Sequence, residues 1–157
     1  MNFQNFLVKE YPLKDFVDEF IEVHFSPDWE YGTEQLQKKF LRDQTVSFAE
    51  LIEKGVAKRY GAFLGSKLIA DLGFFWNDMF IRFNNVATHY NFRRQGACSP
   101  LVSHVCSEIV KTGKEIVMQA DINYHAFKIY ESIGFKEKDR VISLEWRDKT
   151  RFGLPVF

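Results

Sequence analysis

Cysteine, proline and glycine are scarce in this sequence, and neither sign of charge is in excess. The 157 residues include 2 Cys, 4 Pro and 9 Gly, and 21 Lys and Arg balance 21 Asp and Glu. Two cysteines are too few for a disulfide framework, and so little Gly and Pro excludes collagen-like and low-complexity chains. Nonspecific binding to nucleic-acid phosphates requires an excess of Lys and Arg, so we expect no nucleic-acid partner.

Long apolar runs are also absent. No stretch approaches the ~20 apolar residues that a membrane-spanning helix requires, and the first residues contain acids and a proline where a signal peptide would be continuously apolar. The spacing of Cys98 and Cys106 matches no zinc pattern, so we expect no metal and a reducing environment. These absences predict a soluble, cytoplasmic protein with no membrane partner.

Phenylalanine, in contrast, is abundant, with 17 residues in a chain whose hydrophobic fraction is 46%. This apolar content excludes disorder. A chain of this length typically forms one domain and buries about 70% of its unfolded surface. We therefore expect a single packed domain over residues 1–157, with a core rich in aromatic rings.

The first 55 residues have the apolar spacing of helices. Apolar side chains three and four apart run from 13 to 24, and a second helix is expected near Thr33–Arg42 with Thr33 as its N-cap. Ser47–Glu50 has the pattern of a capping box that begins a third, short helix, and Gly55 would end it. This part of the chain is therefore predicted to be helical.

Three β-rich runs follow, and then helices alternate with strands. The runs are joined by Gly65-Ser66 and Asn77-Asp78, two-residue turns that are typical of hairpins. The expected elements are strands Ala57–Leu64, Lys67–Phe75 and Met79–Thr88, a helix ending near Gly113, a strand Glu115–Ala120, a helix Tyr124–Ile133 and a strand Val141–Trp146. This order predicts a mixed α/β (α+β) fold in which helices flank a mostly antiparallel central sheet.

The junction between the third strand and the next helix has the character of an anion site. A basic loop with Arg93 and Arg94 leads through Gly96 into a helix that begins near Ala97, and Pro100 suits the first helical turn. The free N–H groups and the dipole of a helix N-terminus bind phosphates. The loop has neither the Gly-Lys-Ser/Thr of a Walker loop nor the further glycines of a dinucleotide fingerprint. Taken alone, it is equally compatible with solvated arginines around an ordinary turn.

The segment Arg93-Arg94-Gln95-Gly96-Ala97-Cys98 resembles the Arg/Gln-x-x-Gly-x-Gly/Ala signature of the GNAT acetyltransferase superfamily. In that superfamily the backbone amides of this turn hold the pyrophosphate of coenzyme A. The resemblance implies that Arg93 opens the motif and that the pyrophosphate is bound by Arg94, Gln95, Gly96, Ala97 and Cys98, although Cys98 departs from the signature. The preceding strand would pair its main chain with the pantetheine amides, like a strand added to a sheet edge, at Val86, Ala87 and Thr88.

A second segment, Asn123–Phe135, resembles the Asn-x-x-Ala-x-x-x-Tyr-x-x-x-Gly-Phe pattern of the same superfamily. The resemblance implies that Asn123 bonds the pantetheine arm. It also implies that Tyr130 faces the coenzyme sulfur and gives a proton to the departing thiolate. A packed core aromatic is the alternative role for Tyr130. The resemblance covers about residues 56–146.

The function implied by the resemblance is that of a GNAT-type acyltransferase with acetyl-CoA as co-substrate. A cofactor-binding core at 56–146 would follow an acceptor-side region at 1–55, and the acetyl group would pass directly to the primary amine of a small molecule. The strand Met79–Thr88 contains no carboxylate to act as general base, and its Asn84 and Asn85 can only orient a water. Two alternatives stay open, a protein or peptide N-acetyltransferase and a non-catalytic CoA-binding sensor or interaction module. A homodimer also stays open.

Aromatic and acidic residues gather after the first helix, at Phe25, Asp28, Trp29, Glu30 and Tyr31. Ring faces and carboxylates suit a cationic amine, so these residues are candidates for acceptor binding; alternatively, they cap the core. Arg82, in an otherwise apolar strand, is expected to form an ion pair with Asp71 or Asp78 rather than to bind a substrate carboxylate.

Overall fold

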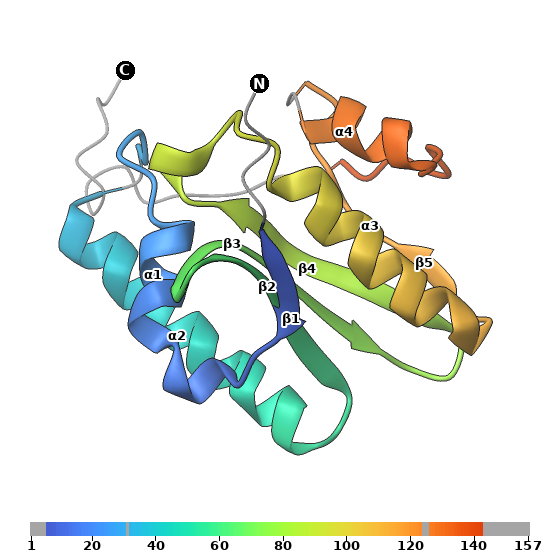
Figure 1. Ribbon diagram of the computed structural model, residues 1–157, viewed down its shortest axis with the longest axis horizontal. Coiled ribbons are helices and arrows are strands. Elements are labelled where there is room, and N and C mark those ends of the chain that lie inside the picture. The colour runs from blue at the N-terminus through green and yellow to red at the C-terminus, as the bar shows by residue number, and fades with distance from the viewer. Residues whose placement is uncertain (1–5, 31, 124–125, 143–157) are drawn as a thin grey trace.

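The computed structural model describes residues 6–30, 32–123 and 126–142. Five strands form one sheet in the order β1-β2-β3-β4-β5 (Figure 1). They are β1 (Leu7–Glu10), β2 (Ala57–Leu64), β3 (Lys67–Trp76), β4 (Phe80–Thr88) and β5 (Glu115–Val117). The pairs from β1 to β4 are antiparallel and β5 runs parallel to β4, which confirms the predicted mixed, mostly antiparallel sheet.

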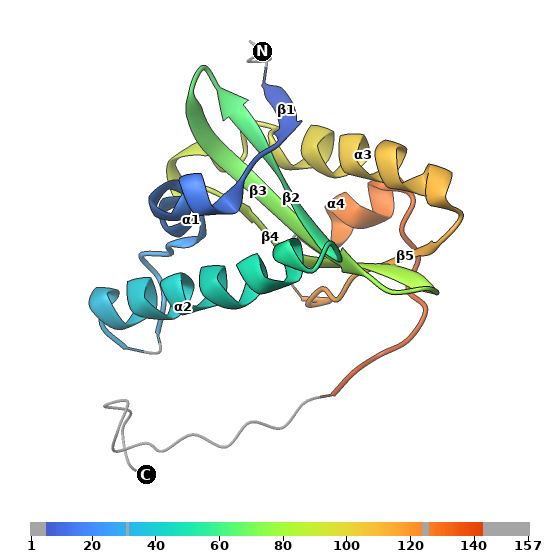
Figure 2. The same cartoon turned by 90° about the horizontal axis from the view of Figure 1, so that it is seen from below.

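Helices cover both faces of this sheet (Figures 1 and 2). On one face lie α1 (Val17–His24) and α2 (Glu34–Glu53), and on the other lie α3 (Cys98–Ile109) and α4 (Ala126–Ile133). Three short 3-10 helices complete the described elements, η1 (Leu13–Asp15), η2 (Tyr90–Phe92) and η3 (Val110–Thr112). The sheet is therefore the middle of three layers.

Each face of the sheet has its own apolar core, and both contain phenylalanine. Phe20, Phe48 and Phe63 belong to the core under α1 and α2. Phe74 and Phe83 belong to the core under α3 and α4. Burial of these rings on two faces accounts for much of the phenylalanine content, since large aromatic side chains contribute most to the apolar area removed from water.

The N-terminal region is not wholly helical, because it begins with strand β1. β1 pairs antiparallel with β2, with Leu7 opposite Phe63 and Glu10 opposite Tyr60. Its side chains are mostly exposed, and its four residues, Leu-Val-Lys-Glu, do not alternate between apolar and polar. The periodicity of the sequence therefore does not predict this strand. The charges of Lys9 and Glu10 suit an edge strand, because charged side chains discourage pairing with another chain.

The two helices expected between Thr33 and Gly55 are one continuous helix, α2. Thr33 is its N-cap, as predicted, and its Oγ1 accepts a hydrogen bond from the amide of Leu36 at 3.2 Å. Ser47 does not begin a new helix. It lies inside α2, and its hydroxyl donates to the carbonyl of Asp43, one turn earlier, at 3.4 Å. Serine in the middle of a helix can bond the preceding turn in this way, so a capping-box pattern alone does not end a helix.

The other predicted boundaries differ from the structure by a few residues. β3 extends to Trp76, β4 begins at Phe80, and β5 ends at Val117, short of the predicted 120. α4 is described from Ala126, and positions 124–125 of the predicted helix lie outside the described residues. Of the strand predicted at 141–146, residues 141 and 142 are not in a strand and the rest lies outside the described residues.

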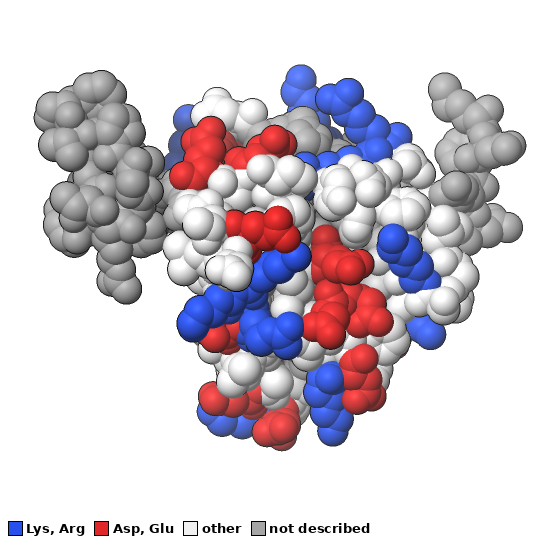
Figure 3. All heavy atoms as spheres, turned by 90° about the vertical axis from the view of Figure 1, so that its left-hand side faces the viewer, with Lys and Arg blue, Asp and Glu red and all other residues white. Residues whose placement is uncertain are grey.

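Charged side chains of both signs are interspersed over the face formed by α1 and α2 (Figure 3). Ion pairs on this face join Lys38 to Glu34, Lys39 to Asp43 and Arg42 to Asp18. In the part of the chain that the structure describes, no helix has the length and hydropathy needed to cross a membrane. The same residues bring together no group of three or more His, Cys, Asp or Glu that could hold a metal ion.

Candidate functional site

Strand β4 has an open side over its second half. β5 pairs with it only as far as Arg82, which lies opposite Val117. Within the described sheet, Val86, Ala87 and Thr88 are therefore paired with β3 alone. An unpaired row of backbone N–H and C=O groups is what an extended ligand needs in order to bind as an added strand.

A bulge lies directly before this open edge. The register between β3 and β4 shifts from Gly73 opposite Asn84 to Leu72 opposite Val86, so Asn85 is the extra residue. Its φ of 49° is uncommon for a residue other than glycine. Bulges bend a strand and re-aim its side chains, so the change in direction of β4 begins where the open edge begins.

The loop after β4 turns sharply into α3. Arg94 and Gly96 both have positive φ, 61° and 83°. Two side chains of the loop bond nearby main chain. Arg93 Nε donates at 3.3 Å to the carbonyl of Thr88, at the end of the otherwise open edge of β4, and Gln95 Nε2 donates at 3.0 Å to the carbonyl of Asn91. These bonds hold the turn in place without using its backbone amides.

The start of α3 has the features of an anion site. α3 begins at Cys98, within one residue of the predicted start, and Ala97 makes no side-chain cap. The first amides of a helix have no partner within the helix, and the dipole makes this end positive. A Cβ added at Gly96 would meet nothing within 4 Å, so the turn faces open space. Arg93 and Arg94 are exposed beside it.

Cys98 departs from the superfamily signature without closing the turn. Its side chain is partly buried and packs against the core that contains Leu101 and Val102. Burial raises the pKa of the Cys98 thiol, which is therefore protonated at neutral pH. Cys98 acts in this position as a small apolar side chain.

Tyr130 is buried on the face of α4 that packs against the core, with 7% of its surface exposed. Its ring meets Phe135 edge to face at 6.2 Å, and Phe135 in turn lies 5.9 Å from Phe83 of β4. Asn123 is in the exposed turn before α4, where its amide donates to Asp121 Oδ1 at 2.8 Å. The ring of Phe135 thus lies between Tyr130 and β4. The roles of Tyr130 and Asn123 toward coenzyme A stay predictions.

The acceptor-binding candidates form the loop after α1. The ring of Phe25 is half-buried and meets Tyr90 of η2 edge to face at 6.4 Å, so this loop contacts the segment that follows β4. Tyr31 lies outside the described residues. The loop also contains the half-buried Trp29 and the exposed Asp28 and Glu30. Their part in acceptor binding stays a prediction.

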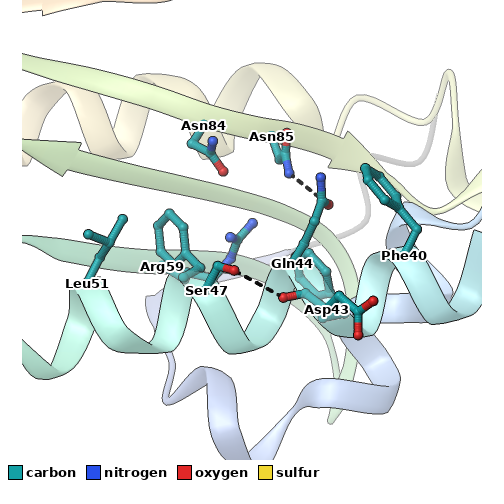
Figure 4. Close-up of a pocket in the computed structure, with 10 residues that line it drawn as sticks. Phe40, Asp43, Gln44, Ser47, Leu51, Arg59, Asn84 and Asn85 are labelled. Carbon is teal, nitrogen blue, oxygen red and sulfur yellow. Dashed lines mark hydrogen bonds between the residues drawn. The ribbon is translucent and has the colours of Figure 1, made fainter. Parts of the chain in front are cut away.

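A pocket of about 400 Å³ lies between α2 and the sheet, beside the bulge of β4 (Figure 4). Helix α2 lines it with Phe40, Asp43, Gln44, Ser47, Phe48 and Leu51. The other walls come from α1, β2 and β4, through Phe20, Arg59, Asn84 and Asn85. Asn85 Nδ2 donates to Gln44 Oε1 at 3.3 Å. The pocket therefore touches β4 immediately before the open edge.

Of the residues that line the pocket, the sequence points to only two, Asn84 and Asn85, as side chains that could orient a water for acetyl transfer. The six residues from α2 recur three and four apart between positions 40 and 51, which is one face of a helix. This stripe crosses Ser47, where the capping-box pattern predicts a new helix. The predicted break in α2 therefore concealed one wall of the pocket.

Three polar side chains surround Asp71 beneath the pocket, and this carboxylate is 0% exposed. Arg59 Nε donates to Asp71 Oδ1 at 3.0 Å, and Arg59 Nη2 donates to Oδ2. The hydroxyl of Tyr11 donates to Oδ1 at 2.5 Å. His24 Nε2 lies 2.7 Å from Oδ2, and because a carboxylate can only accept, this nitrogen carries the proton.

The Arg59 side chain is fixed in position and forms part of the pocket wall. Its guanidinium lies between the rings of Phe20 and Phe48, 4.6 Å from each centroid. Gly73 provides the space for it, because a Cβ there would be 2.8 Å from Nη1. With both faces on aromatic rings, one edge on Asp71 and 1% of its surface exposed, Arg59 cannot turn toward a ligand.

This pairing fixes the charges of the group. Burial favours the neutral form of Asp71, but the Arg59 guanidinium and the hydrogen bond from His24 outweigh it and hold the pKa of Asp71 at about 2. Burial lowers the pKa of His24, which is therefore neutral at pH 7. Burial and the Asp71 charge raise the pKa of Tyr11 well above its usual value. At neutral pH the group contains one anion and one cation.

Among the described residues, Arg82 forms no ion pair with either of the partners that the sequence suggests, Asp71 or Asp78. The β3–β4 register sets it opposite Phe75, four residues along β3 from Asp71, and Arg59 already bonds that carboxylate. The Arg82 side chain is exposed, and its Nη2 donates to Gln119 Oε1 at 3.1 Å. Strand pairing, which the sequence does not display, decides which cation reaches Asp71.

The family model of FR47-like protein matches residues 59–144, which is more than half of the chain. This span agrees with the region of about 56–146 over which the two motifs resemble the GNAT superfamily. No curated protein sequence matches the chain.

Solved structures give the same answer for the fold. A transcriptional regulator from Bacillus halodurans C-125 is 18% identical with a TM-score of 0.70, over 90% of this chain and 100% of its own. Glucosamine-6-phosphate N-acetyltransferase from Arabidopsis thaliana is 15% identical with a TM-score of 0.65, over 91% and 99%. An aminoglycoside acetyltransferase from an uncultured soil metagenomic sample is 20% identical with a TM-score of 0.61, over 94% and 98%. At these identities the likeness concerns the fold, and together with the family match it shows that the chain belongs to the FR47-like family of the GNAT superfamily.

Proposed function

We propose that this protein is an acetyl-CoA-dependent N-acetyltransferase that passes the acetyl group directly to the primary amine of a small molecule. The proposal is carried by the arrangement along β4. The pocket touches the bulge at Asn85, the open edge follows at Val86–Thr88, and the turn Arg93–Cys98 leads into α3. An extended acyl carrier with a diphosphate at one end matches this order of features.

The main chain supplies most of the proposed binding. The open backbone of Val86–Thr88 pairs with the pantetheine amides, and Asn123 bonds the same arm. The amides of Gly96–Cys98 hold the diphosphate at the positive end of α3, and the exposed Arg93 and Arg94 add charge beside it. Bound acetyl-CoA supplies an activated acyl group, so the transfer needs no covalent intermediate on the protein.

Direct transfer needs few side chains. The amine must be neutral to attack, the developing oxyanion needs a hydrogen-bond donor, and the departing thiolate gains from a proton. A backbone N–H of Val86–Thr88 is the proposed oxyanion donor, and the hydroxyl of Tyr130 is the proposed proton donor. Because β4 contains no carboxylate, a water oriented by Asn84 and Asn85 is the proposed carrier of the amine proton.

A small acceptor is supported by the size of the pocket. Its volume of about 400 Å³ falls within the range of about 300–1,000 Å³ that is typical of small-molecule sites. Two of the structural neighbours act, by name, on small amines, an aminoglycoside and glucosamine-6-phosphate. We further propose that Phe25, Asp28, Trp29 and Glu30, none of which lines this pocket, contact the acceptor outside it. For Trp29→Ala, a raised acceptor KM supports this role, and a lower melting temperature with unchanged KM supports packing alone.

The test is release of free coenzyme A thiol from acetyl-CoA, measured over a panel of amines and peptides beside thermal melting with and without acetyl-CoA. Turnover on an amine and stabilisation by acetyl-CoA support the proposal. Turnover confined to peptides replaces it with a protein N-acetyltransferase. Stabilisation without turnover on any acceptor replaces it with a CoA-binding sensor. If no CoA ester stabilises the protein, the proposed cofactor is wrong.

A further inference from the structure

We infer that the acceptor is a monoamine with an apolar aryl or alkyl body, bound in the pocket between α2 and β4. This inference rests on the proposed N-acetyltransferase function and goes beyond it by naming the class of amine. It separates this chain from the two named neighbours, because aminoglycosides carry several ammonium groups and glucosamine-6-phosphate carries a phosphate. The inference follows from which charges the pocket offers, where its neutral polar groups lie, and which apolar surface it leaves exposed.

Both charged side chains that line the pocket, Asp43 and Arg59, already have partners of opposite charge. Its one carboxylate, on Asp43, points away from Asn84 and Asn85 (Figure 4). This side chain is 64% exposed, and its Oδ2 accepts from Lys39 Nζ at 2.6 Å. The one guanidinium, on Arg59, is 1% exposed, and its Nε and Nη2 both donate to the buried carboxylate of Asp71. Beside Asn84 and Asn85, a second ammonium would therefore meet no unpaired carboxylate, and a phosphate would meet no unpaired cation.

The polar groups that do face the pocket from its β4 side are neutral amides. Gln44 reaches across from α2 toward Asn85, and Asn84 lies beside them (Figure 4). Gln44 Oε1 already accepts from Asn85 Nδ2, and the remaining oxygens and N–H groups of the three amides are enough for one small polar group. An amide oxygen can accept an N–H of a neutral amine and leave the nitrogen lone pair for attack. The amides therefore define a place for a single amino group next to the bulge.

Aromatic rings also line the pocket. Phe40, one helical turn before Gln44, is 52% exposed (Figure 4), whereas Phe20 and Phe48 are buried. A phenylalanine ring left half in water on a helix is a surface that an apolar ligand body can cover, and the area removed from water favours binding. Leu51 extends this apolar lining. The body of the ligand is therefore expected to be apolar.

A neutral, apolar pocket also addresses the lack of a general base on β4. Transfer of an ammonium group from water into such surroundings favours the uncharged amine, because desolvation penalises the charged form. The one carboxylate of the pocket, on Asp43, pairs with Lys39 in solvent and points away from the amides, so it opposes this effect little. The amine is thus bound in the form that can attack the thioester.

The panel that tests the inference contains 2-phenylethylamine, spermidine, kanamycin and glucosamine 6-phosphate, each assayed by thiol release from acetyl-CoA. The expected result is a kcat/KM for 2-phenylethylamine at least tenfold above the other three. A higher kcat/KM for any of the other three overturns the inference and leaves the proposed N-acetyltransferase function intact. No turnover and no stabilisation by acetyl-CoA overturn the proposed function itself, and the inference with it.

Phe40→Ala tests the pocket directly, because the side chain is exposed enough that its loss leaves the fold intact. The expected result is about a tenfold increase in KM for 2-phenylethylamine, with the KM for acetyl-CoA and the melting temperature unchanged. Val46→Ala is the matched control, since Val46 is 60% exposed on the same helix and does not line this pocket. Equal acceptor KM values for Phe40→Ala and Val46→Ala overturn the inference.

Discussion

Replacement of Asp71 by asparagine is expected to destabilise the protein by about 3–5 kcal/mol, because it leaves the buried guanidinium of Arg59 without its counter-charge. Asp71 is 0% exposed and Arg59 is 1% exposed, so water cannot solvate the unpaired cation. Asparagine also presents an NH₂ group where Oδ2 accepts from Arg59 and His24. One acceptor is thereby replaced by a donor that faces two donors.

The lowered pKa of Asp71 points to an effect in the same direction. Its pKa of about 2 in the fold, against 3.8 ordinarily, corresponds to about 2 kcal/mol favouring the charged form over the neutral one. The asparagine variant loses the negative charge and also places a donor against other donors. The expected loss of stability therefore exceeds about 2 kcal/mol. Most domains have a free energy of unfolding of about 5–15 kcal/mol. The variant should therefore still fold, but it should unfold at a lower denaturant concentration.

Urea unfolding followed by circular dichroism measures the effect. With a slope of about 2 kcal/mol per molar urea, the midpoint of Asp71→Asn should fall by about 2 M. Asp18→Asn is the matched control, because Asp18 also pairs with an arginine, Arg42 at 2.8 Å, but its side chain is 83% exposed. That substitution should change stability by no more than about 1 kcal/mol. Equal midpoints for the two variants would refute the reasoning.

A double variant separates the unpaired charge from loss of packing. Arg59→Met combined with Asp71→Asn removes the buried cation as well as the anion. If the stranded charge is the cause, the double variant should be more stable than Asp71→Asn alone. A double variant whose loss equals the sum of the two single losses would show that the two residues are not coupled.

Three further predictions concern packing, pH and catalysis. Gly73→Ala should lower the stability by about 1–3 kcal/mol, because the new Cβ would lie 2.8 Å from a guanidinium of Arg59 that cannot move, and a lower melting temperature would register it. Stability should fall in two stages on acidification, and urea midpoints at stepped pH should follow both. Burial lowers the pKa of His24 in the fold, so below about pH 6.5 the unfolded chain binds a proton there more readily than the folded chain, and stability falls. The pKa of Asp71 is also lower in the fold, so the same happens there below about pH 3.8. A flat midpoint between pH 7 and pH 5 would contradict the first stage. Tyr130→Phe should lower kcat while acetyl-CoA still raises the melting temperature, and an unchanged kcat across the pH range would exclude Tyr130 as the proton donor.

Local sequence determined the parts of this protein whose causes lie within a few residues. The hairpin turns at Gly65-Ser66 and Asn77-Asp78, the N-cap Thr33 and the start of α3 were all predictable. Gly65 takes the left-handed conformation with a φ of 62°, and the Asn77 side chain accepts from two amides that follow it. The two GNAT motifs are also local, and they mark the same region as the FR47-like family match.

Tertiary structure decided the features that depend on residues far apart in the chain. The Asp71 group joins residues 12, 47 and 60 positions away, and Gln44 meets Asn85 from a distance of 41 positions. In the sheet formed by the described residues, the pairing of β5 ends at Val117 and leaves the second half of the β4 edge open. Periodicity and turn chemistry act over one or two turns of chain, whereas strand register and burial are set by partners that only the folded chain brings together. For this reason the sequence alone indicated the family and the turn proposed to bind the cofactor, whereas the pocket proposed for the acceptor became visible only in the fold.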